Sequence, residues 1–255
     1  MTDIPNGTDI VVDAEAGTLQ VSRSLLLALG AFSGGATGRA DPPSGVTVKT
    51  LRAAGMLGPT GLHDMLVPIA AAVADPLVRI IYHQLGPGSA TESPGWITPD
   101  VTVLAVPGED GLDEILSFGT SFLVARLAAL VALGPRPDAG PLPGSLKVDP
   151  GLLEAAFTGL VGSAQDVRRH LGPAVPAAWV DAVVALRENP RRHWRVTTTW
   201  GAASKPSGRS LEIVESPDGT LLHVGRTGSG AELTAVTPTA VWRLLIGLLP
   251  GDDEL

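Results

Sequence analysis

The sequence contains no cysteine, few aromatic residues and only three lysines. The absence of cysteine excludes disulfides, thiolate nucleophiles and thiolate metal sites. Aromatic residues make up 4% of the chain, within a hydrophobic fraction of 44%, so a core must be built mainly from Ala, Leu and Val. The formal net charge of −8 is opposite to the basic footprint expected of a nucleic-acid-binding protein. It leaves room for a local basic patch.

Long apolar runs are also missing. A transmembrane helix needs about twenty apolar residues, whereas the best candidate, residues 118–133, is shorter and contains Arg126. Residues 1–7 lack the basic and apolar regions of a signal peptide. We therefore expect a cytoplasmic protein with no membrane insertion.

No familiar catalytic or metal-binding spacing occurs. The histidines do not stand at His-x-x-x-His or His-x-His spacing, so a zinc site would need distant ligands. His63 and Asp64 lack a Gly-x-Ser-x-Gly nucleophile elbow. Residues 30–45 are rich in glycine but lack the Lys-Ser/Thr pair of a phosphate-binding loop, and they predict a flexible loop. The sequence thus predicts no catalytic residues, no metal site and no cofactor.

The best-defined pattern lies in residues 194–250, which predict a meander of antiparallel strands closed by an apolar helix. Side chains 194, 196, 198 and 200 share one face of the first strand because strand side chains alternate. Residues 216–220, Ser-Pro-Asp-Gly-Thr, have the chemistry of a tight turn. Thr237 and Pro238 fit the N-cap and first position of the closing helix.

The chain repeats this plan. Leu-Gly-Pro at 57–59 recurs at 171–173, and a residue-proline break at 75–76 recurs at 189–190, each 114 residues later. The helix-ending prolines Pro135 and Pro250 lie 115 residues apart. We therefore predict an α+β fold. Two α/β halves related by a pseudo-twofold axis would share a central, mainly antiparallel sheet flanked by helices.

Five segments follow from the pattern, with the two halves expected to form one integrated domain. They are 1–45 (N-terminal strands, short helix and Gly-rich loop), 46–137 (first half), 138–149 (Pro/Gly linker), 150–250 (second half) and 251–255 (acidic tail). Within the first half, helices are predicted at 50–56, 62–74 and 118–131, strands at 77–83, 101–106 and 112–116, and a polar loop at 86–95.

The clearest charge feature is basic. Arg187, Arg191 and Arg192 suit a helix C-terminus, where the helix dipole favours cations. Lys205 and Arg209 flank the predicted loop 201–208 instead, and a basic rim around a loop suits an acidic protein partner, the alternative being a solvated loop.

Trp200 stands at the start of the same loop. It is either an exposed interface anchor or the last core residue of its strand. The region centred on Trp200, Lys205 and Arg209 is the candidate partner-binding site.

Several stretches together resemble a known family. They are the proline-broken first half closing in Leu-Gly-Pro-Arg-Pro (133–137), the Pro/Gly linker, and the meander ending in Val-Thr-Pro-Thr-Ala-Val-Trp-Arg-Leu-Leu (236–245) and Leu-Leu-Pro (248–250). The chain resembles the EspG-like proteins of actinobacterial type VII (ESX) secretion over most of its length. The resemblance implies a cytoplasmic α+β chaperone that binds PE–PPE heterodimers through its sheet and adjoining loops.

Three hypotheses follow. The first is a non-enzymatic chaperone of a type VII secretion substrate, either a PE–PPE-like heterodimer or another secreted helical hairpin of WXG type. The second is a small hydrolase whose site gathers His63, Asp64 and His223 from separate segments. The third is a structural protein that pairs with itself through its sheet.

Overall fold

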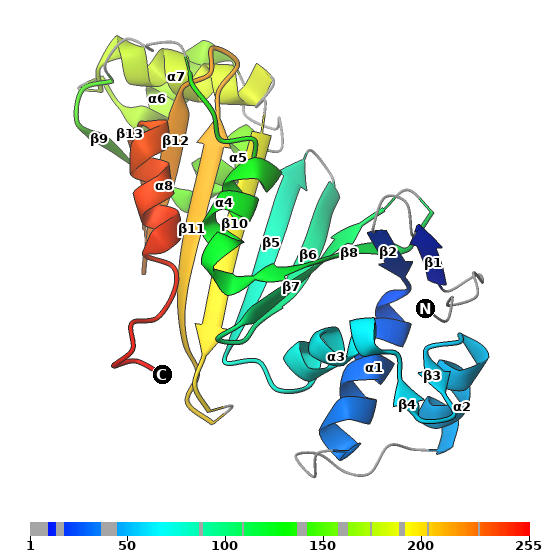
Figure 1. The fold of residues 1–255 in the computed structure, drawn as a ribbon. Helices are drawn as coiled ribbons and strands as arrows, with labels where there is room; N and C mark the ends of the chain where they lie inside the picture. The colour runs from blue at the N-terminus through cyan, green and yellow to red at the C-terminus, as the bar shows by residue number, and fades with distance from the viewer. Residues whose placement is uncertain are drawn as a thin grey trace.

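A computed structural model describes residues 10–13, 18–36, 45–86, 89–108, 110–136, 142–157, 163–173, 175–188, 192–202, 204–228 and 230–255. The described residues form one antiparallel sheet of eleven strands with helices on both faces (Figure 1). The strand order is β1-β2-β8-β7-β6-β5-β10-β11-β12-β13-β9. Among the described residues, none of the helices combines the length and apolarity needed to cross a membrane.

The N-terminal part adds two edge strands and a helical layer. Strands β1 and β2 pair with each other, and β2 continues onto β8. Helix α1 packs on α3, while β3 and β4 form a small separate hairpin. The elements are β1 (Ile10–Asp13), β2 (Thr18–Val21), α1 (Arg23–Ala36), α2 (Gly45–Ala53), β3 (Leu57–Gly58), β4 (Gly61–Leu62), the 3-10 helix η1 (Asp64–Leu66) and α3 (Val67–Ala74).

Each half then contributes a four-stranded meander followed by a helix. The first comprises β5 (Val78–Gly86), β6 (Ser89–Ile97), β7 (Val101–Pro107), β8 (Asp113–Gly119), the 3-10 helix η2 (Thr120–Phe122) and α4 (Leu123–Leu130). The second comprises β10 (Arg192–Trp200), β11 (Ser207–Glu215), β12 (Leu221–Thr227), β13 (Gly230–Val236) and α8 (Pro238–Ile246). Between them lie β9 (Ser145–Val148), α5 (Pro150–Phe157), α6 (Ala164–Leu171) and α7 (Ala177–Glu188).

The two meanders meet at the centre of the sheet, where β5 pairs with β10. Val78 lies opposite Trp200, and Leu85 lies opposite His193. On either side of this seam a four-stranded meander is followed outwards by further strands, β2 and β1 on one side and β9 on the other. This arrangement confirms the predicted pseudo-twofold architecture around a shared antiparallel sheet.

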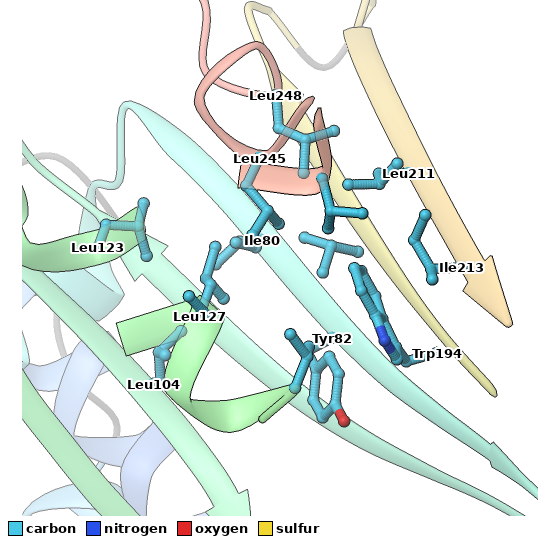
Figure 2. Close-up of a cluster of buried hydrophobic side chains, with 14 of the residues drawn as sticks. Ile80, Tyr82, Leu104, Leu123, Leu127, Trp194, Leu211, Ile213, Leu245 and Leu248 are labelled. Atoms are coloured by element: carbon cyan, nitrogen blue, oxygen red, sulfur yellow. The ribbon is translucent and has the colours of Figure 1, made fainter. Parts of the chain in front are cut away.

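The buried side chains form three hydrophobic cores on the two faces of the sheet. Helices α4 and α8 pack against each other and cover the middle of one face (Figure 1). Beneath them, Trp194 of β10 and Ile80 of β5 meet Leu127 and Leu245 (Figure 2). On the opposite face, α1 to α3 cover the β6–β8 end. Helices α5 to α7 cover β11 to β13 on that same face.

Several local predictions hold. Trp194, Val196, Thr198 and Trp200 are all buried on one face of β10. In the 216–220 turn, the Gly219 N–H donates to the Ser216 carbonyl, with Gly219 at φ +90°. The Thr237 hydroxyl accepts from the Ala240 N–H and caps α8, with Pro238 in its first turn.

Other local predictions were wrong. The predicted polar loop 86–95 is largely strand β6, in which Ser93 and Pro94 pair with β5 but lie before the stretch, Gly95–Ile97, that also pairs with β7. The helix predicted over 118–131 begins only at Leu123, because Phe118 belongs to β8. The helix predicted over 62–74 is η1 followed by α3, with Pro68 in the first turn. The range 138–149, predicted as a linker, contains the edge strand β9.

Helix α1 also runs on to Ala36, into residues 30–45, which were predicted to form a flexible loop. A methyl group on Gly30 would lie 2.5 Å from Val73 Cγ1. The glycine therefore serves close packing of α1 on α3 rather than helix termination. Residues 37–44 of that predicted loop lie outside the described residues.

Candidate partner-binding surface

A strip at the centre of the sheet lies between the two helical layers on their common face. We call it the central strip and define it by the side chains of β5, β10 and β11 that point to this face. These are Arg79, Ile81 and His83 of β5, Arg195, Thr197 and Thr199 of β10, and Ser210 and Glu212 of β11. Arg79, Thr199 and Ser210 are exposed, and the others, except Glu212, are half-buried. The strip is therefore a polar surface supported by a rigid sheet.

Strand alternation explains why this surface is polar. In β10 the side chains of Trp194, Val196 and Trp200 are buried beneath α4 and α8. The residues between them, Arg195, Thr197 and Thr199, then face the opposite side, and the helical layers there lie further out along the sheet. Thr197 and Ser210 are cross-strand partners, and their hydroxyls lie 3.2 Å apart.

One end of the strip contains a dense ionic cluster around Glu212, whose side chain is 3% exposed. His193 Nε2 lies 2.9 Å from Glu212 Oε1. Arg195 donates to Oε2 from Nε at 3.0 Å and Nη2 at 2.7 Å. Arg226 of β12 donates from Nε to Oε2 at 2.9 Å and from Nη2 to Oε1 at 3.0 Å. We call these four residues the Glu212 cluster.

The cluster keeps Glu212 ionised. Burial raises the pKa of a carboxyl group, but hydrogen bonds from His193 and Arg226 and the charges of both arginines outweigh it. Together they lower the pKa of Glu212 to about 2. The same hydrogen bonds raise the pKa of the Arg226 guanidinium. The positions of both arginines are thus fixed by a permanent negative charge beneath them.

The cluster also joins the strip to the C-terminal helical layer. The Phe157 ring of α5 packs on the His193 ring with centroids 4.3 Å apart. Next to His193 in the register, Val214 belongs to the core that α5 to α7 cover. The strip is therefore packed directly against that helical layer.

The residues predicted as the partner-binding site lie at the far end of β10 and β11. Trp200 and Arg209 lie on the face that α4 and α8 cover, and Lys205 lies in the hairpin loop. Trp200 is 6% exposed and belongs to the core beneath α8, so it is the last core residue of its strand. Lys205 is exposed in the hairpin loop, where its N–H donates to the Ala202 carbonyl.

Arg209 binds the C-terminal segment. Its Nη1 donates to the carbonyls of Gly247 at 3.0 Å and Leu249 at 2.6 Å. Its Nη2 contacts both carboxylate oxygens of Glu254, and its guanidinium lies 5.3 Å from the centre of the Trp200 ring. The structure thus brings Trp200 and Arg209 together in an internal contact and leaves Lys205 facing solvent.

The structure also shows where other basic residues lie. Arg192 donates to the Val131 carbonyl at 3.1 Å, so it anchors the end of α4 rather than α7. Arg191 lies outside the described residues. In α6, Ser163 and Asp166 form a capping box, and the cations Arg168 and Arg169 lie in the last turn, where the helix dipole favours them.

The residues of the hydrolase hypothesis are not brought together. His63 precedes η1 and its N–H donates to Met56 in the N-terminal layer. His223 lies in β12, between Ile213 and Thr234, on the other side of the β5–β10 seam. Within the described ranges, no group of three or more His, Asp or Glu residues has the arrangement of a metal site.

The charge pattern of the sequence did not single out Glu212 or Arg226. The available signal was a charged residue inside the apolar run Leu-Glu-Ile-Val at 211–214. A buried charge in a strand needs a partner, but the partners lie 14 to 19 residues away in sequence and depend on the register.

The sequence matches no protein-family model and no curated protein. The fold, however, is similar to a solved structure, the Mycobacterium tuberculosis type VII secretion chaperone EspG5 in complex with the PE25–PPE41 dimer. The TM-score is 0.58 at 16% sequence identity, and the match covers 91% of this chain and 97% of that chain. The chain therefore has an EspG-like fold along nearly its whole length.

Proposed function

We propose that this protein is a cytoplasmic, non-enzymatic member of the EspG-like family, a chaperone that binds a substrate of type VII (ESX) secretion. The substrate would be a PE–PPE-like helical heterodimer or a related secreted helical hairpin. The observation that carries the proposal is the fold shared with EspG5 over 91% of this chain and 97% of that chain, in a structure that contains a PE–PPE dimer.

The central strip supports a binding role because it combines exposure with rigidity. Its side chains come from the middle of an eleven-stranded sheet, whose backbone is held on both sides by neighbouring strands. Binding groups on such a scaffold need little ordering when a partner docks. We assign the docking surface to the central strip, with Lys205 of the adjoining loop at its rim. Trp200 and Arg209 would support that loop from within.

The function is tested by co-expression with secreted helical-hairpin proteins encoded beside it. A tagged chain should co-purify with at least one such pair and increase its solubility. If every neighbouring pair, including PE–PPE and WXG-type proteins, fails both to co-purify and to gain solubility, the proposal is wrong.

The assignment of the docking surface is tested by a substitution that adds a charged, bulky side chain to the strip. Thr197→Arg, on the exposed face of the β5–β10 seam, should weaken capture of the pair by at least tenfold while leaving the melting temperature within a few degrees. Thr239→Arg, exposed on α8 and on the other face, is the matched control and should bind as the wild type does. Lys205→Glu should weaken capture less, because a rim charge mainly affects association. Equal binding by Thr197→Arg and Thr239→Arg would place the interface elsewhere.

A further inference from the structure

The Glu212 cluster has more hydrogen-bond donors than its own carboxylate uses. Each guanidinium carries five N–H donors, and Arg195 and Arg226 each use Nε and Nη2 on Glu212. Within the described residues, Nη1 of Arg195 and Nη1 of Arg226 donate no hydrogen bond. The two side chains are 34% and 44% exposed, although the carboxylate beneath them is 3% exposed. The unused donors therefore belong to side chains that solvent reaches.

The charges at this end of the strip favour an anion. Glu212 offsets only one of the two arginines, because a single carboxylate lies between them. Arg79, another exposed cation on this face, lies at the other end of the strip, opposite Thr199. The nearby acids are Glu92, opposite His83 in β6, and Glu154 of α5, which faces Arg226 and has an interaction of its own. Within the cluster itself, two arginines and one carboxylate leave an excess positive charge, on a chain whose formal net charge is −8.

The arrangement also fixes the geometry of the donors. Free arginine side chains lose considerable rotamer entropy on binding, whereas these two are already held by two hydrogen bonds each. Guanidinium groups fixed in this way match the planar, bidentate geometry of a carboxylate.

From these contacts we infer that Arg195 and Arg226 form a preorganised receptor for an acidic side chain, Asp or Glu, carried by the secreted partner. This inference rests on the proposed function, since it names the chemistry by which the central strip would recognise its substrate. Glu212 is then a positioning residue, and the two arginines make the contact. Partners with an amide or an apolar residue at that point would bind less well, because the unused donors would be desolvated without an acceptor.

Binding of the co-purified pair gives the first test. Arg226→Gln and Arg195→Gln should each weaken the affinity on the order of tenfold and flatten its dependence on salt, since an ionic contact is lost. Arg243→Gln removes an exposed arginine from α8 on the other face and should leave both unchanged. Arg226→Lys keeps the charge but not the planar guanidinium with its paired donors. Its affinity for the pair should lie between those of wild type and Arg226→Gln.

A probe of defined chemistry gives the second test, independent of any natural partner. The probe is an alanine-based helical peptide with two adjacent glutamates at one end, compared with the same peptide carrying glutamines. In nuclear magnetic resonance, the Nε–H signals of Arg195 and Arg226 should shift with the glutamate peptide and stay in place with the glutamine peptide. The Arg243 signal should shift with neither peptide.

The outcomes separate the two proposals. If a secreted pair binds wild type, Arg195→Gln and Arg226→Gln equally well, the acidic contact is wrong while the chaperone function stands. If the glutamate and glutamine peptides act alike, or if inorganic phosphate at the same concentration shifts the signals equally, the carboxylate assignment is overturned. If the protein responds only to the glutamate peptide but no secreted pair co-purifies, the carboxylate receptor is supported and the proposed function is wrong.

Discussion

At the scale of single residues, charged side chains tie separate elements together. Glu212 of β11 accepts hydrogen bonds from His193 and Arg195 of β10 and from Arg226 of β12, so it ties the three strands together on the strip face. Arg209 does the same on the other face, where it joins β11 to the segment after α8. Such residues connect elements that the backbone ladder alone would leave free to shift.

Glu212→Gln should lower the free energy of unfolding at neutral pH by about 2–3 kcal/mol, because two arginines lose their counter-charge. The pKa of Glu212 is about 2 in the folded chain, below the ordinary value of 4.5, so the folded state binds fewer protons between those values. The stabilisation is therefore complete above pH 4.5 and is lost as the pH falls towards 2.

Urea denaturation of both proteins between pH 2 and 7 checks this prediction. The wild type should lose its advantage over Glu212→Gln across that window. A constant difference between the two proteins down to pH 2 would show that the carboxylate is not the titrating group.

Arg209→Ala should release the C-terminal segment without unfolding the domain. The change removes the donor of four hydrogen bonds and the cation above the Trp200 ring, at a cost of about 1–2 kcal/mol. Amide hydrogen exchange over residues 247–254 should speed up, whereas β10 and β11 keep their protection. Arg243→Ala is the control. Unchanged exchange in Arg209→Ala would mean that the segment is held by the Thr198 hydroxyl, which donates to the Leu248 carbonyl at 2.7 Å.

At the scale of elements, two glycines leave room for side chains of neighbouring elements. A methyl group on Gly95 of β6 would lie 2.3 Å from Leu104 Cδ2 and 2.7 Å from Ile80 Cγ2. Gly30 makes the corresponding close approach between α1 and α3. Both positions were predicted as loop because glycine is a poor former of strands and helices. Packing of neighbouring elements overrides that local preference.

Gly30→Ala tests this explanation, because helix propensity and packing predict opposite changes in the free energy of unfolding. Helix propensity alone predicts stabilisation of up to about 1 kcal/mol, whereas the contact with Val73 predicts destabilisation of about 1–3 kcal/mol. We expect destabilisation in thermal or urea unfolding. In a double-mutant cycle, Val73→Ala should recover part of the loss, since it removes the Cγ1 atom that the new methyl group meets. A more stable Gly30→Ala protein would contradict the close packing of α1 on α3.

At the scale of the whole molecule, the β5–β10 pairing joins the two halves into one sheet, and α4 and α8 close over the seam. We propose that the halves form one cooperative domain, as the repeat suggests. Each half alone would expose a central strand as an unpaired edge together with the apolar floor beneath its helix.

Residues 142–255 expressed alone should therefore form a dimer. Because β5 and β10 are pseudo-twofold equivalents, β10 of a second copy can occupy the place of β5, and α8 of that copy the place of α4. Light scattering should give twice the mass of the fragment, whereas the full chain stays monomeric over the same concentration range. A soluble, monomeric fragment would show that β10 does not need a partner strand. Self-association of the full chain would instead favour the structural-protein hypothesis.

The sequence by itself determined the local pieces of this protein. Strand alternation in residues 194–200, the turn at 216–220 and the cap at Thr237 depend on side chains a few residues apart, so they could be predicted and were found. The spacing of proline breaks also predicted the repeated architecture, because breaks mark where elements end.

Tertiary structure decided which of these pieces meet. Strand β6 exists because β5 and β7 pair with it on both sides, despite Pro94 and Gly95 in its sequence. The Glu212 cluster exists because the register brings His193, Arg195 and Arg226 to one carboxylate, and Arg209 turns inward because the C-terminal carbonyls reach it. These contacts join residues 14 to 40 positions apart, and only the packing of the complete sheet brings them within hydrogen-bonding distance.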